Sequence, residues 1–273
     1  MDLKRWLETH PYLAPIARVE AVVAEAGGPA PAIAEPRWEA YRKDYQQGVS
    51  LLRSGAAGID LSGPAAEVLG RLIEALAESS LPQTLLDSSR ALRGEFRRDP
   101  GATAQVIRGL VAGEEEGGRP PAQRGLLFYL GWTAVSRALA PVVSSFERWR
   151  EEEAWNHGHC PTCGASPLLA WLEPGEAGRR RRLICGCCAT RWSFRRIGCP
   201  RCGNDDSGRL AILEVEGEEG LRLDFCENCK GYLKTYSGSG DPPRWLADWT
   251  TLHLDIIARQ RGYQRKGNSL YQL

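Results

Sequence analysis

The chain has 273 residues, a formal net charge of +1 and nine cysteines, the first of them at Cys160. This length allows two domains. The near-neutral charge disfavours a protein that tracks nucleic-acid backbones, because such proteins usually present a clearly basic surface. The first residues, Met1 to His10, are charged throughout and lack the apolar core of a secretory signal. We therefore expect a cytoplasmic protein.

The first part of the chain, residues 1–156, predicts an all-α domain. The dipeptide Gly63-Pro64 favours the start of a helix, in which leucine and isoleucine recur at helical spacing as far as Leu76. Residues 27–34 form a Pro/Ala/Gly linker. Helices are expected over residues 14–26, 36–53, 63–76, 82–98, 102–116 and 122–155, with a kink in the last one at Pro141.

The stretch from Gly125 to Val143 is the nearest approach to a membrane span. Arg137 lies near its middle, and Pro141 lies near its end. A central arginine costs about 2.5–3.5 kcal/mol on an insertion scale. We therefore expect a buried helix and no membrane span.

Four Cys-x-x-Cys motifs, or knuckles, lie within the seventy residues from Cys160 to Cys229. Two cysteines at this spacing can point both sulfurs at one ion, and a glycine after the second cysteine allows the left-handed turn that this needs. Two knuckles supply four thiolates, a tetrahedral set that both zinc and mononuclear iron accept. We therefore expect two metal ions, and the eight candidate ligands are Cys160, Cys163, Cys185, Cys188, Cys199, Cys202, Cys226 and Cys229.

The same unit of knuckle, hairpin, knuckle and strand occurs twice, with a repeat of about forty residues. The gaps between paired knuckles hold 21 and 23 residues, slightly above the usual interval of about 15–20 in ribbon sites. Strands are expected over residues 167–172, 182–184 and 191–195 in the first unit and over 209–215, 221–225 and 232–236 in the second, with hairpin turns at 174–178 and 217–220.

The repeat predicts one metal site in each unit. The first two knuckles then hold one ion, and the last two hold the other. An alternative, in which the middle knuckles close one site and the outer knuckles the other, would break the repeat. Cys187 could replace Cys188 as a ligand, but only one residue separates it from Cys185, which makes a poorer chelate.

The odd number of cysteines and a reducing cytosol disfavour a disulfide framework.

The last part of the chain begins with a Ser/Gly/Pro-rich break over residues 237–243. A final helix is expected over 244–259, followed by a polar tail over 261–273. The chain is therefore expected to be an α+β protein with an N-terminal all-α domain, two zinc-ribbon β modules and a C-terminal helix. Its expected parts are residues 1–156, 157–198, 199–240 and 241–273.

The motif order over roughly residues 155–268 resembles the formate dehydrogenase accessory proteins, the FdhE family. The resemblance is carried by the four knuckles, by Thr190-x-Trp192 after the second and by Tyr232-Leu-Lys234 after the fourth. Near the C-terminus, Asp248-x-x-Thr-Leu-x-Leu-Asp255 and Gly262-Tyr263 are also similar to that family. Over the first 150 residues the similarity is limited to a helical layout.

The resemblance implies a cytoplasmic maturation factor and not an enzyme. Members of this family are required for active molybdenum- or tungsten-containing formate dehydrogenases and bind their catalytic subunit. Their metal sites are described as rubredoxin-like and can hold iron, so the eight knuckle cysteines are the implied functional residues. The chain departs from the family pattern in its shorter extensions, in Cys187 and in the arginines around Trp192, which leaves the identity of the partner open.

Three functional hypotheses follow. In the first, the ribbons dock a protein partner through Trp192, Phe194, Tyr232 and Tyr236 with nearby arginines. For each single ring, however, we favour the simpler interpretation that it fills the space between the ribbons. In the second, the run Arg179 to Arg182 binds nucleic acid. Residues 157–236 hold 12 basic and 10 acidic residues, and two thiolate-bound metal ions would make this part net negative. A net negative charge disfavours binding to nucleic acid.

The third hypothesis is thiol chemistry at Cys187, beside the expected ligand Cys188. Four thiolates leave a metal no open position for a substrate water, which disfavours metal catalysis. His157 and His159 precede the first knuckle and could be spare ligands, hydrogen-bond donors to the ligands or surface residues. We favour surface residues. Zinc and iron cannot be distinguished from these ligand types.

Overall fold

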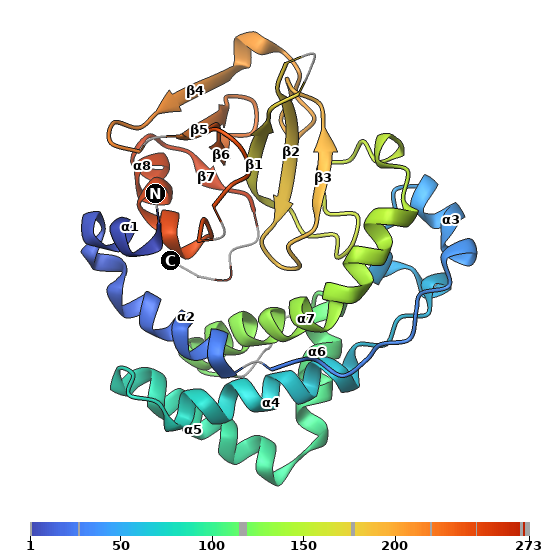
Figure 1. Cartoon of the computed structure of the whole chain (residues 1–273), viewed down its shortest axis with the longest axis vertical. Helices are drawn as coiled ribbons and strands as arrows, with labels where there is room; N and C mark the ends of the chain where they lie inside the picture. Colours follow the sequence, from blue (N-terminus) through green and yellow to red (C-terminus); the bar gives the residue numbers. More distant parts are fainter. Residues whose placement is uncertain are drawn as a thin grey trace. The chain divides into compact units, whose positions relative to one another are not determined.

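The computed structural model describes residues 2–26, 28–114, 119–175, 178–218, 220–243, 245–267 and 270. Contacts divide the chain into two compact units. The helical unit consists mainly of Met1–Arg37 and Ala57–Arg148, and the ribbon unit consists of Trp38–Ala56 and Trp149–Ser269. The chain is an α+β protein with a helical N-terminal part, a sheet region and a C-terminal helix, as the sequence predicts (Figure 1).

Helix α4 lies at the centre of the helical unit, because it packs against α2, α5 and α6. Its leucine and isoleucine side chains at helical spacing, from Leu69 to Leu76, are buried. Each such side chain contributes about 1.5–3 kcal/mol when it leaves water. The helices of this part are α1 (Leu3–Thr9), α2 (Ala14–Ala26), α4 (Ser62–Glu78), α5 (Gln83–Arg98), α6 (Gly101–Ala112) and α7 (Pro121–Trp149).

Several helix ends differ from the sequence prediction. Helix α3 (Trp38–Gln46) is shorter than the expected 36–53, because Gly48 has a left-handed φ of 77° and a separate 3-10 turn, Leu51–Arg53, follows it. Helix α6 stops at Ala112 because Gly113 caps it at φ 77°; the predicted end at Glu116 lies outside the described residues. Helix α7 ends at Trp149 instead of 155, and α1 was not predicted.

By length and composition alone, α7 could cross a membrane. Its most apolar window is, however, 61% buried inside the protein. Arg137 within this helix donates a hydrogen bond of 2.6 Å to the carbonyl oxygen of Val23. The helix continues through Pro141. These features are typical of a core helix.

The strands of the ribbon unit form one sheet across the described residues, in the order β3–β2–β1–β6–β5–β4 (Figure 1). Each half is an antiparallel three-stranded ribbon, and parallel pairing of β1 with β6 joins the two halves. This junction was not predicted. The strands are β1 (Pro167–Glu173), β2 (Arg180–Cys185), β3 (Arg191–Phe194), β4 (Leu210–Glu214), β5 (Leu221–Cys226) and β6 (Gly231–Tyr236). The predicted turns at 174–178 and 217–220 lie partly outside the described residues.

The C-terminal segment folds onto the second ribbon. A 3-10 turn, Trp249–Thr251, leads into α8 (Leu252–Gln260), so the regular helix is shorter than the predicted 244–259. The predicted start at Arg244 lies outside the described residues. The short strand β7 (Gln264–Arg265) pairs with β6 in a segment that the sequence suggested was only a polar tail.

Candidate metal centres

The four knuckles share one backbone conformation. The residue after the second cysteine is left-handed in each, with φ of 81° at Gly164, 60° at Ala189, 73° at Gly203 and 52° at Lys230. The sequence predicts this turn at the two glycines. Ala189 and Lys230 adopt it despite their Cβ atoms, at a cost of roughly 1–2 kcal/mol each. The folded turn therefore needs stabilisation from the contacts that its cysteines make.

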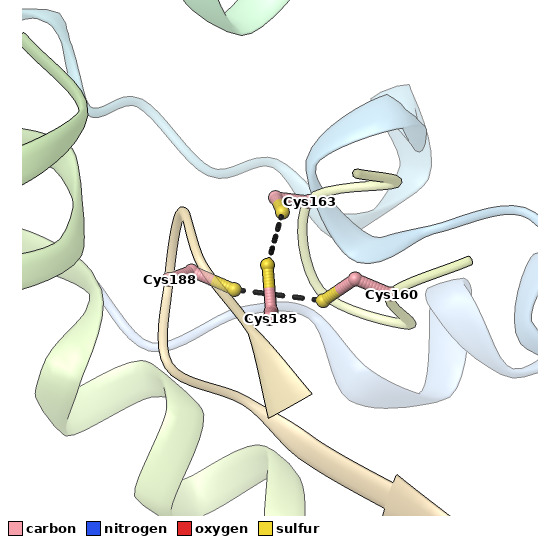
Figure 2. Close-up of side chains that lie close together, drawn as sticks. All are labelled: Cys160, Cys163, Cys185 and Cys188. Carbon is pink, nitrogen blue, oxygen red and sulfur yellow. Dashed lines mark hydrogen bonds between the residues drawn. The ribbon is translucent and has the colours of Figure 1, made fainter. Parts of the chain in front are cut away.

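In the first cluster, four sulfurs from two knuckles face one another (Figure 2). The Sγ atoms of Cys160 and Cys188 lie 3.5 Å apart, and those of Cys163 and Cys185 lie 3.4 Å apart. A tetrahedral ion with metal–sulfur bonds of about 2.3 Å separates its sulfurs by about 3.8 Å, whereas a disulfide would join them at about 2.0 Å. The spacing fits a shared ion.

Hydrogen bonds reach these sulfurs from the protein. The amide of Thr162 donates to Cys160 Sγ over 3.4 Å, and the amide of Cys187 donates to Cys185 Sγ over 3.3 Å. The Thr190 hydroxyl lies 3.2 Å from Cys188 Sγ. Such contacts hold the sulfurs in position for a shared ion.

The chain N-terminal to the first knuckle supports it. Within the ribbon unit, the amides of Leu51 and Leu52 donate to the carbonyl oxygens of Pro161 and Thr162, each over 2.8 Å. The Ser50 hydroxyl donates to the Cys160 carbonyl oxygen over 2.8 Å. The sequence favours a helix over residues 36–53 and gives no indication of this support.

In the second cluster, Cys199 and Cys229 sulfurs lie 3.7 Å apart, as do those of Cys202 and Cys226. This cluster is less enclosed, because Cys202 is exposed and Cys229 is half-buried, whereas the first cluster is buried throughout. Burial raises the pKa of Cys199 to about 12. The four cysteine sulfurs of this cluster lie within 4.8 Å of one another, a ligand set that fits zinc or iron.

The structure also places the other candidate residues. Cys187 is 2% exposed, and its sulfur belongs to neither group of four among the described residues. His157 is exposed, as expected, whereas His159 is half-buried with its Nε2 atom 3.1 Å from the carbonyl oxygen of Gly48.

The proposed aromatic docking surface is not present in the expected form. Trp192 is 0% exposed and donates its indole N–H to the carbonyl oxygen of His157. Phe194 and Tyr232 are each 9% exposed, and Tyr236 is half-buried. These rings pack inside the ribbon unit, as the space-filling interpretation expects, so they do not offer the exposed surface that the docking hypothesis needs.

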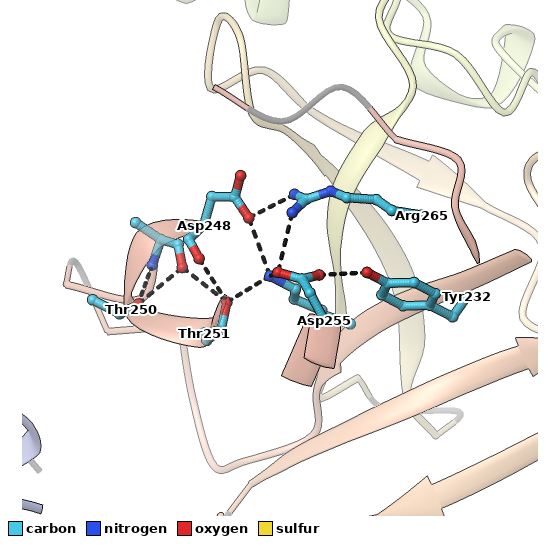
Figure 3. Close-up of polar contacts among 8 residues, drawn as sticks. Tyr232, Asp248, Thr250, Thr251, Asp255 and Arg265 are labelled. Carbon is cyan, nitrogen blue, oxygen red and sulfur yellow. Dashed lines mark hydrogen bonds and ion pairs between the residues drawn. The ribbon is translucent and has the colours of Figure 1, made fainter. Parts of the chain in front are cut away.

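Figure 3 shows a buried polar network around Asp248, Asp255 and Arg265. Lys234 belongs to this network. Its ammonium group, on a side chain only 2% exposed, donates to Asp255 over 2.7 Å and to Asp248 over 3.1 Å. Arg265 from β7 pairs with the same two carboxylates, and the Tyr232 hydroxyl donates to Asp255 over 2.6 Å. The network connects β6 to α8 and β7, so the motif residues that resemble the family attach the C-terminal segment to the second ribbon.

Comparisons with known proteins find several FdhE relatives. An FdhE homologue from Stutzerimonas stutzeri is 31% identical over 181 residues, which cover 64% of this chain and 56% of the relative. FdhE of Escherichia coli is 29% identical over 49% of this chain and 44% of its own length. The chain therefore spans about half the length of these relatives. No family model matches the chain.

A solved structure extends the comparison to the fold. The crystal structure of the FdhE protein from Pseudomonas aeruginosa matches with a TM-score of 0.65 over 97% of this chain and 91% of that chain, at 24% identity. Fold and sulfur clusters together define a zinc-ribbon-like protein with two four-cysteine sites. These matches confirm the resemblance of the chain to the FdhE family.

Proposed function

We propose that this protein is a cytoplasmic, non-catalytic accessory factor that binds the catalytic subunit of a molybdenum- or tungsten-containing formate dehydrogenase before that enzyme is complete. The observation that carries the proposal is the pair of four-sulfur clusters in a chain whose sequence resembles FdhE proteins. Four thiolates fill the coordination shell of a tetrahedral ion, so each site would stabilise structure and would leave no position for a substrate.

The eight knuckle cysteines are the proposed ligands, with Cys160, Cys163, Cys185 and Cys188 at one ion and Cys199, Cys202, Cys226 and Cys229 at the other. The ion is iron or zinc. Metal binding would supply folding free energy that such short hairpins lack. The expected parts, residues 1–156, 157–198, 199–240 and 241–273, remain our proposal for the domain organisation.

The test is capture of partners from the native cytoplasm with a tagged protein, followed by mass spectrometry. We expect a formate dehydrogenase catalytic subunit, and we expect its loss when Cys160 and Cys199 are both changed to Ser. In a strain without this protein, formate dehydrogenase activity should fall and should return with the wild-type chain. Unchanged activity in that strain, with no dehydrogenase subunit captured, would overturn the proposal.

A further inference from the structure

A cavity of about 240 Å³ lies within the ribbon unit beside the second cluster. Its floor includes Ile212, Asp224 and Leu233. These residues are directly paired across β4, β5 and β6, so their side chains lie on the same face of this half of the sheet. One wall comes from residues 196–201, which connect the first ribbon to the third knuckle. Ile212 is 59% exposed, and Ile197 on that wall is 56% exposed. The cavity therefore has an apolar surface open to solvent.

Basic groups outnumber acidic groups around this cavity. Asp224 forms ion pairs with Arg222 at 2.9 Å and with Arg181 at 3.4 Å, so one carboxylate faces two guanidinium groups. The Arg181 side chain is 5% exposed, and its buried Nε atom has no hydrogen-bond partner among the described residues. Arg196 and Arg201 add two exposed guanidinium groups to the lining. This charge excess favours an anionic ligand.

Strand β4 offers a backbone edge next to the cavity. It is the end strand of the sheet and, within the described residues, pairs only with β5 (Figure 1). Ala211 and Ile212 of this strand are exposed. An end strand presents unpaired N–H and C=O groups, and an extended peptide can add to it as a further strand. Alternate side chains of such a peptide would then face the same side of the sheet as the cavity.

We propose that this cavity and the edge of β4 bind an extended acidic–apolar segment of a partner protein, with an apolar side chain against Ile212 and carboxylates near Arg196 and Arg201. The identification of that partner as a formate dehydrogenase subunit rests on the proposed function above. The chemistry of the segment follows instead from the apolar floor, the excess of arginine and the unpaired strand edge.

A peptide test does not depend on the identity of the partner. The probe is a short fluorescein-labelled peptide in which Asp and Leu alternate, and its anisotropy is measured with the metal-loaded full-length protein. A matched peptide with Lys in place of Asp serves as the charge control. We expect the acidic peptide to bind and the basic one to bind at least about tenfold more weakly. Absence of binding, or equal binding of the two, would overturn the proposal.

Variants locate the binding surface. Ile212→Glu, and separately Arg196→Glu with Arg201→Glu, should weaken acidic-peptide binding by about tenfold or more. Ile256→Glu is the matched control, because Ile256 is 50% exposed on α8 and does not line the cavity. Arg259→Glu with Arg261→Glu is the matched charge control, since both arginines are exposed outside the lining. Equal loss in control and test variants would place binding elsewhere.

The same variants separate this proposal from the proposed function. If wild-type protein captures the dehydrogenase subunit and Ile212→Glu captures it equally well, the partner does not use this surface and the inference is wrong, while the accessory role stands. If the acidic peptide binds at Ile212 but no dehydrogenase subunit is captured, the accessory role is wrong and the peptide-binding surface stands.

Discussion

At the scale of single residues, the two clusters differ in what surrounds their sulfurs. Thr190 lies beside Cys188 Sγ, and its hydroxyl also lies 2.8 Å from the hydroxyl of Thr162, with both threonines fully buried. Around the second cluster, Asn228 at 3.5 Å from Cys202 Sγ is an exposed contact. Buried polar partners of ligands hold those ligands in position and tune their affinity for metal.

The first prediction concerns Thr190→Val. The change keeps the shape of the side chain and removes the hydroxyl beside Cys188, so the first site should bind its metal about tenfold more weakly. Competition with a chromophoric chelator measures this affinity. The second site of the same protein is the control, because its cysteines lie on other knuckles. Equal affinity in the variant and the wild type would show that the hydroxyl does not support the thiolate.

The second prediction concerns Lys234→Met. Removal of this ammonium leaves Asp248 and Asp255 buried with Arg265 as their remaining cation. Breaking a buried ion pair by removing one partner costs about 3–5 kcal/mol, so the free energy of unfolding should fall by about that amount. Denaturant unfolding of the metal-loaded protein, followed by tryptophan fluorescence, measures it.

Lys230→Met is the control for that experiment. Lys230 is also paired with a carboxylate, Glu227, but both side chains are largely in solvent. Exposed ion pairs contribute about 0–1 kcal/mol, so this change should have little effect. Similar losses in the two variants would mean that burial of Lys234 does not matter for stability.

At the scale of elements, each ribbon brings two knuckles together, but the ribbons do so in different environments. All four cysteines of the first cluster are buried. In the second cluster, Cys202 on the third knuckle is exposed and Cys229 is half-buried. A chelator in solution can reach an exposed ligand directly, whereas a buried site must first open.

The third prediction is therefore that metal leaves in two phases. With an excess of chelator, one equivalent should be released quickly from the second cluster and one slowly from the first. Stopped-flow absorbance of the chelator, with the metal content checked by elemental analysis, measures both phases. Cys202→Ser should remove the fast phase and keep the slow one. Release in a single phase, or retention of the fast phase in that variant, would contradict the assignment.

The sequence predicted the elements of both ribbons because their signals are local. Knuckle spacing and period-two alternation place β1 to β6 within a few residues of their observed bounds. Pairing of β1 with β6 was not predictable in this way, because it depends on contacts such as Leu169 with Lys234 that lie 65 positions apart. The left-handed turns at Ala189 and Lys230 carry no glycine to indicate them.

For the candidate site, too, the sequence predicts local features but not contacts between distant segments. Which cysteines come together followed from the repeat, since the two units have the same order of knuckles and hairpins. What covers Trp192 and Tyr232 did not follow, because alternation assigns each ring to one face of its own strand without saying what packs on that face. The support of the first knuckle by residues 50–52 is likewise a contact between distant segments.

At the scale of the whole molecule, the chain crosses between its two compact units more than once. Residues 38–56 belong to the ribbon unit, although residues 1–37 and 57–148 on either side of them belong to the helical unit. Within the ribbon unit, Tyr45 stacks on Trp155 with ring centroids 5.3 Å apart. The two divisions of the chain therefore predict different unfolding when metal is removed. In a helical domain over 1–156, residues 38–56 would stay folded with the helices, whereas as part of the ribbon unit they would unfold with the ribbons.

The fourth prediction is that α3 loses its structure together with the ribbons. Metal removal should unfold the knuckles and with them the acceptors that Leu51 and Leu52 use, because metal binding provides much of the folding free energy of such modules. Helix α4 has its own apolar core in the helical unit and should stay folded. Hydrogen–deuterium exchange of the metal-free and metal-loaded protein should therefore show loss of protection over 38–46 and over β1 to β6, with protection retained over 68–77.

Retained protection over 38–46 would favour a domain boundary near residue 156. Loss of protection over 68–77 as well would mean that the two units unfold as one cooperative structure.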